Sequence, residues 1–96
     1  MDVPALALKP AEPTVAELAE ICLMHLANNP DQLAEFMSLS GLSPDDLRRG
    51  AARGTLANGL IDHVVQNEPL LLAICAEASL RPETIMRVWA KLNPAG

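Results

Sequence analysis

The sequence predicts an all-α fold, a compact bundle of about six short helices arranged as two tandem three-helix pseudo-repeats that share one core. Three observations favour this class. Half of the 96 residues are hydrophobic while only Phe36 and Trp89 are aromatic, so the core must be aliphatic, a composition that suits helices. Helix-start signals recur along the chain, and the sequence aligns with itself after a shift of 38 positions.

The first two helices are marked by capping residues. Residues 1–13 contain three prolines and no sustained apolar period, so we expect an extended tail. Thr14 and Glu17 form a capping box that starts the first helix, because each side chain satisfies a free backbone N–H of the first turn. Asn29, followed by a proline and an aspartate, starts the second helix, and Gly41 is placed to end it in a left-handed conformation.

Four more helices follow from the same signals. Ser43 precedes a proline and two aspartates and so predicts a third helix, which ends at Gly54. A fourth helix is expected over about 55–66, although a glycine inside it lowers its intrinsic helicity. The fifth, "EPLLLAICAEASL", is apolar almost all round, which is typical of a central helix or one at a subunit seam. Pro82 opens the sixth.

The 38-position shift organises these helices. Nine identities occur in 35 aligned positions, among them His25 with His63, Asn29 with Asn67 and Pro44 with Pro82. We therefore predict pseudo-repeats over about 14–53 and 54–92 within one domain, 14–93, with 94–96 as a second tail. Each helix has one strong apolar stripe, so neither unit should bury its face well alone.

Composition restricts the function. The net charge is −5, and residues 1–46 hold eight acids against one base, net −7. Such a chain is a poor default nucleic-acid binder, because duplex affinity comes largely from Lys and Arg. No apolar run approaches the roughly 20 residues of a membrane span, so we expect a soluble, cytoplasmic protein. Cys22 and Cys75 are too few for a disulfide framework and are interpreted as buried thiols.

With these stretches interpreted, the chain resembles a family of short all-helical alphaproteobacterial proteins known only as a domain of unknown function. The likeness lies in "AELAEICLMHLANNPDQLAEFMSLSGLSPDDLRR" and "LIDHVVQNEPLLLAICAEASLRPETIMR", which with their linker span nearly all of residues 16–92. The resemblance implies no assigned activity and therefore no functional residues to carry over. The family pattern is typically aromatic where His25 and His63 stand, so a histidine-based function is not implied.

Two cysteines and two histidines could in number form a zinc site. They are Cys22, His25, His63 and Cys75. Cys22 and His25 lie three residues apart on one helix and could share a ligand. The remaining spacing matches no zinc finger, and the 38-position shift pairs the histidines but not the cysteines. We therefore expect no metal and no cofactor, with both histidines on the core face.

The stretch "SGLSPDDLRR", residues 40–49, has the turn spacing of a helix-turn-helix motif. The helix that follows begins with Asp45 and Asp46, whose carboxylates would repel DNA phosphates, so we interpret the stretch as a helix start. Basic residues on the third helix of each repeat form a possible anion-binding stripe; they are Arg49, Arg53, Arg87 and Lys91. The plainer interpretation is that they offset the helix dipoles.

Catalysis has little support, because we find no Ser/His/Asp spacing, no phosphate-binding glycine loop and no paired carboxylates in an apolar surround. We expect a protein that is not an enzyme. Apolar residues off the inner stripes should exceed what one core can hide, and exposed patches of that kind mark partner surfaces. The residues expected there are Met24, Ile61, Val65 and Leu72. The main hypothesis is a protein–protein interaction module acting by self-association or helix docking; the alternative is a nucleic-acid-associated accessory protein using the basic stripe.

Overall fold

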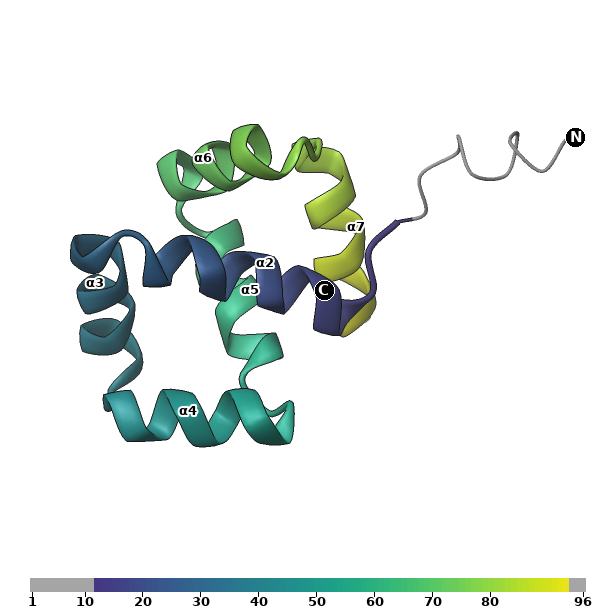
Figure 1. Cartoon of the computed structure of the whole chain (residues 1–96). Coiled ribbons are helices and arrows are strands. Elements are labelled where there is room, and N and C mark those ends of the chain that lie inside the picture. The colour runs from purple at the N-terminus through teal and green to yellow at the C-terminus, as the bar shows by residue number, and fades with distance from the viewer. Residues whose placement is uncertain (1–11, 94–96) are drawn as a thin grey trace, which may run out of the picture.

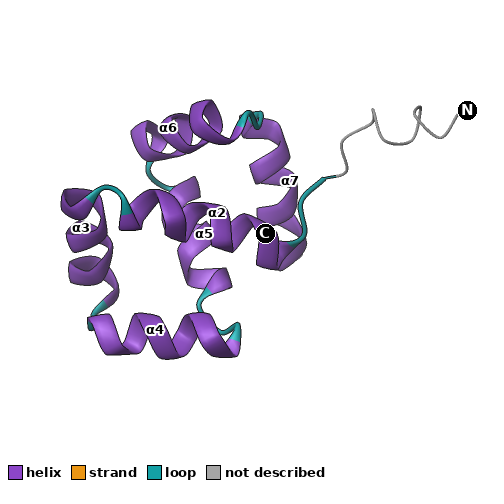
Figure 2. Cartoon of the chain, in the orientation of Figure 1, coloured by secondary structure: helices purple, strands orange, loops and turns teal. Residues whose placement is uncertain are grey.

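The computed structural model describes residues 12–93, so the predicted tails at 1–11 and 94–96 lie outside the described residues. The described part contains six α-helices and no strand (Figures 1 and 2), which confirms the all-α class. Their bounds are α2 Val15–Ala27, α3 Pro30–Ser40, α4 Pro44–Arg53, α5 Ala57–Val65, α6 Glu68–Ala78 and α7 Pro82–Leu92. Over this range, no helix combines the length and apolar character that crossing a bilayer requires.

The helix starts follow the local signals of the sequence. Thr14 forms the predicted capping box with Glu17. Ser43 caps α4, as predicted, and its box with Asp46 is an additional feature of the structure. Asn29 departs from its expected role, because it makes no side-chain cap to α3. Its amide Nδ2 instead donates to the backbone oxygen of His25 over 2.6 Å and so closes the end of α2.

The helix ends use the left-handed conformation. Gly41 has φ 77° and Gly54 φ 72°, as their places after α3 and α4 predict, because glycine enters this region without steric cost. Ser79, which corresponds to Gly41 after the 38-position shift, ends α6 with φ 57°. Both halves thus reverse direction at the same point of the alignment.

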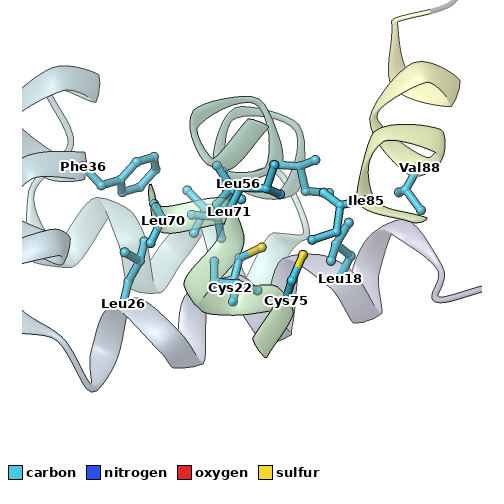
Figure 3. Packing of buried hydrophobic residues seen from close by; sticks show 14 of the residues in the cluster. Leu18, Cys22, Leu26, Phe36, Leu56, Leu70, Leu71, Cys75, Ile85 and Val88 are labelled. Carbon is cyan, nitrogen blue, oxygen red and sulfur yellow. The ribbon is translucent and has the colours of Figure 1, made fainter. Parts of the chain in front are cut away.

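Helices α2 and α5 cross at the centre of the molecule and make the most extensive helix–helix contact (Figure 1). α3 and α4 extend to one side of this crossing, while α6 and α7 lie on the other. The core forms around the crossing (Figure 3). Its buried hydrophobic residues are Leu18, Cys22, Leu26, Phe36, Leu47, Leu56, Leu60, Ile61, Val64, Leu70, Leu71, Ile74, Cys75, Ile85 and Val88.

The sequence of α6 is typical of a central helix or of one at a subunit seam, and the structure excludes the central place. α6 lies at the periphery of the bundle (Figure 1) and buries one face, through Leu70, Leu71, Ile74 and Cys75. Leu72 on the same helix keeps 49% of its surface exposed. The centre is taken by α2 and α5, which are each contacted by helices from both halves of the chain.

The first half is packed less tightly than the second. α3 buries only Phe36 and α4 only Leu47, and Ser40 at the end of α3 is exposed. α3 and α6 begin 38 residues apart, as do α4 and α7, which agrees with the alignment. That the two units are superposable repeats stays a prediction.

Candidate binding groove

An apolar groove lies between α2, α4 and α5, with a volume of about 520 Å³. α2 supplies one wall from its first three turns, α4 supplies its last turn, and α5 supplies its start. The lining residues are Val15, Ala16, Ala19, Glu20, Leu23, Gly50, Ala51, Gly54, Leu56, Ala57 and Leu60. This volume is within the range of protein sites that enclose small ligands or apolar side chains.

The groove exists because α4 carries small residues where α7 carries large ones. The first aligned pair, Leu47 and Ile85, is buried in both halves. The next three inward positions differ: Gly50 aligns with Val88, Ala51 with Trp89 and Gly54 with Leu92. In the second half the large side chains pack on the core, whereas α4 has no side chains of that size to place between itself and α2.

Gly50 holds α4 close to the start of α5. A Cβ atom at this position would stand 3.3 Å from the Cβ atom of Leu56, which is tighter than ordinary packing. The two backbones approach because glycine has no side chain. Glycine at this position therefore lets α4 and the start of α5 pack closely.

The groove favours apolar contents. Among the described residues that line it, only Glu20 is charged. Ala16, Ala51 and Gly54 are exposed, so solvent reaches the space that they border. Water in such a space is released when an apolar group enters, which is the ordinary driving force for apolar binding.

A second, more polar pocket of about 640 Å³ lies between α3, α5 and α6. Its lining in the described chain includes Glu35, Asp62 and Glu68 but no Lys or Arg. His63 packs edge-on against Phe36, with ring centroids 5.0 Å apart. Its Nε2 atom is buried without a hydrogen-bond partner.

His25, the aligned histidine, is fully partnered. Its side chain is buried, with Nδ1 2.7 Å from Glu77 Oε1 and Nε2 2.7 Å from Gln32 Oε1. The histidine thereby joins α2 to both α6 and α3. The 38-position shift aligns Glu77 with Leu39 and Gln32 with Leu70. Leucine side chains cannot form hydrogen bonds, which explains why His63 Nε2 has no partner.

The structure does not bring the possible zinc set together. Cys22 and Cys75 are free thiols buried in the core (Figure 3). Both ring nitrogens of His25 are hydrogen-bonded to side chains of α6 and α3, and His63 packs on Phe36. Over residues 12–93 no group of three or more potential ligands could hold a metal ion. Burial, with a smaller effect of Cys75, raises the pKa of the Cys22 thiol to about 12, so this thiol is a poor nucleophile and ligand.

The basic residues do not form one surface. α4, which carries Arg49 and Arg53, is separated from α7, which carries Arg87 and Lys91 (Figure 1). Most of them already have acidic partners. Arg49 pairs with Asp46 at 2.9 Å, and Glu12 pairs with both Arg87 and Lys91 at 2.8 Å.

The residues expected on an apolar interface have different environments. Met24 is 61% exposed and Leu72 is exposed on α6, while Val65 is only partly exposed and packs against the core. The placement of Ile61 on the surface is wrong, because its exposed fraction is 0%. α5 is covered on several sides by α2, α6 and α7, so a residue off its main apolar stripe is also buried.

The groove itself was not anticipated from the sequence. The signal was present, because the 38-position shift sets Gly50, Ala51 and Gly54 against three large apolar residues. A loss of side-chain volume at aligned inward positions predicts either a closer helix approach or an open space. The structure shows both, with the closer approach at Gly50.

Comparison with known proteins identifies one family. A family model described as "Protein of unknown function (DUF3572)" matches residues 13–95. No curated protein and no solved structure matches the chain. The match covers all six helices and every residue that lines the groove.

Proposed function

Because the chain belongs to the DUF3572 family of proteins of unknown function, we propose its function from its own geometry: it is a binding module that accepts an apolar protein segment between α2, α4 and α5. The observation that carries the proposal is the groove, which is apolar, open and lined by small residues of α4. The proposed role is binding without catalysis, and the raised pKa of Cys22 removes one potential nucleophile.

The shape of the groove indicates what kind of segment fits. The space corresponds to side chains that α4 lacks and not to a missing helix, because α4 itself is in place. A helix with its side chains is about 10 Å across, whereas an extended chain can insert single side chains. We therefore propose an extended apolar segment as the ligand.

The test is to fill the groove from within. Ala51 lines it and is exposed, so Ala51→Leu should place a large side chain in the space, as Trp89 does at the aligned position of α7. Ala52→Leu is the matched control, because Ala52 is the next residue on α4, is also exposed and does not line the groove. Tagged wild-type protein and both variants are used to capture proteins from lysate, with and without nuclease.

A protein retained by wild type and Ala52→Leu but lost from Ala51→Leu supports the groove as the binding site. Identical captured sets with the two variants would overturn the proposal. Loss of every partner on nuclease treatment would favour the nucleic-acid alternative instead. The salt dependence of binding gives the same distinction, because phosphate contacts weaken steeply with salt while apolar docking hardly responds.

Self-association through Met24 and Leu72 is a second candidate, favoured by the exposure of these two large side chains. Leu72→Asp should then lower the apparent mass in sedimentation without unfolding the chain. An unchanged mass that already corresponds to the monomer would exclude this surface. The nucleic-acid alternative has less support, because the basic residues are divided between two separated helices and are largely ion-paired.

A further inference from the structure

We propose that residues 3–8 of the same chain, with the sequence Val-Pro-Ala-Leu-Ala-Leu, dock in the groove between α2, α4 and α5. This inference rests on the proposed function and adds a form of regulation to it, because the segment would compete with an external partner for the same site.

The segment begins beside the groove. The described chain starts at Glu12, which accepts hydrogen bonds from Arg87 Nε and Lys91 Nζ at 2.8 Å each and is thereby attached to α7. Two residues later Thr14 caps α2, and Val15 already lines the groove. The ion pairs at Glu12 thus fix the origin of the segment three residues before Val15, the first residue of the groove wall.

The length of the segment is sufficient. Counted from Glu12, which is held by α7, Leu8 is four residues and Leu6 six residues away, so they can reach up to about 13 Å and about 20 Å at roughly 3.3 Å per residue. The wall that α2 contributes runs from Val15 to Leu23 and is about 12 Å long at 1.5 Å per residue. The segment can therefore reverse direction and bring Leu8 to the near end of the groove, with Leu6 farther along it.

The residue pattern suits an extended ligand. Pro4 and Pro10 fix their own φ angles and disfavour helical conformations in the residues before them. In an extended chain Leu6 and Leu8 point to the same side, so both can enter the groove together. The Gly and Ala residues of its lining leave space for such branched side chains.

The charges are complementary. Glu20 is the one charged residue among the described residues that line the groove. Lys9 is the one charged residue between Asp2 and Glu12 in the sequence, and it directly follows Leu8. Docking of Leu8 would bring Lys9 to the rim, where Glu20 is exposed.

A segment of the same chain has an advantage over a free ligand. A short tether keeps it at an effective concentration in the millimolar range, so a few apolar contacts are enough to populate the docked state. An external partner must then exceed this internal competition. Removal of the segment should therefore strengthen binding of a groove partner.

Paramagnetic broadening in the full-length chain tests the docking directly. A nitroxide is attached at Asp2→Cys, and wild-type protein treated in the same way checks that the buried Cys22 and Cys75 do not react. We expect loss of the amide signals of Ala51 and Leu56, at the groove, and retention of the signal of Leu72 on α6. Uniform retention of all three signals would overturn the inference.

Two double variants separate docking from simple proximity to the tether. Leu6→Asp with Leu8→Asp should restore the Ala51 signal, because both side chains that enter the groove become charged. Ala5→Asp with Ala7→Asp, on the opposite side of the extended segment, should leave the signal lost. Equal broadening in the two double variants would overturn the inference. The capture experiment with Ala51→Leu and Ala52→Leu does not depend on this result, so failure of the inference and failure of the proposed function are distinguishable.

A mixed sample identifies which chain supplies the segment. Isotope-labelled protein without a nitroxide is combined with unlabelled protein that carries it. Unchanged Ala51 signals in this mixture, together with their loss in the singly labelled chain, support docking within one chain. Loss of the Ala51 signal in the mixture would overturn the inference in favour of a second copy.

Discussion

At the scale of single residues, the two aligned histidines differ in how well their nitrogens are satisfied. His25 has a side-chain partner for each ring nitrogen, whereas His63 leaves Nε2 buried and unpaired. An unsatisfied buried polar atom costs about 1–3 kcal/mol, while loss of a satisfied hydrogen-bonding group costs about 1 kcal/mol. We therefore expect His63→Leu to raise the free energy of unfolding and His25→Leu to lower it. Urea unfolding of both variants measures the signs, and a decrease in both would contradict the argument.

The core thiols give a pH dependence whose direction is fixed by burial. Desolvation, then the neighbouring Cys75, raises the pKa of Cys22 from 9.0 to about 12, so folding favours the protonated thiol. The corresponding stability is fully present below pH 9 and is lost as the pH rises toward 12. At about 1.4 kcal/mol per pH unit, roughly 3 kcal/mol should be lost by pH 11. Urea midpoints from pH 8 to 11 should fall more steeply for the wild type than for Cys22→Ala, and parallel curves would disagree with this assignment.

At the scale of elements, α4 is the least securely packed helix. It buries only Leu47, and the groove separates much of its inner face from α2. Regions with few buried apolar contacts open at lower free energy than the whole molecule. We expect the α4 amides to exchange with deuterium faster than those of α2 and α5, and Ala51→Leu to slow them by filling the groove. Native-state hydrogen exchange measures this, with Ala52→Leu as the control; equal protection of α2 and α4 would contradict it.

The boundaries of the helices could be predicted from the sequence, whereas their packing could not. Every helix was predicted because its signals are local: Thr14 and Ser43 cap the turns that follow them, and Gly41 and Gly54 end helices through their own backbone freedom. The burial of Ile61 and the central place of α2 and α5 were not predicted. They depend on which helices cross, and this is set by long-range packing and not by the period of one helix.

The candidate site was harder to predict than the fold. Its walls come from three helices. Among the described residues that line it, Glu20 is the one with a charged or polar side chain. A search for reactive or metal-binding residues finds nothing in a groove of this kind. The groove is defined by side-chain volume that Gly50, Ala51 and Gly54 lack, so it becomes visible only when α4 is compared with α7.

At the scale of the whole molecule, the crossing of α2 with α5 makes the two halves depend on each other. Leu18 and Leu26 on α2 and Leu60 and Val64 on α5 are at most 1% exposed, and these two helices make the most extensive contact between the halves. We expect fragments 14–53 and 54–92 to lack helical structure when produced separately, because each would expose the apolar face that the other covers.

Far-UV circular dichroism of each fragment measures this, and the fluorescence of Trp89 reports on the second half. The intact chain should unfold in one transition, with the two signals changing together. Leu18→Ala should lower the free energy of that single transition by about 2–5 kcal/mol, the usual cost of removing a buried leucine side chain. If either fragment alone were helical and unfolded cooperatively, or if the Trp89 signal changed at a different urea concentration from the helical signal, the two units would be independent domains. The groove between α2, α4 and α5, whose walls come from both units, would then be a site between domains.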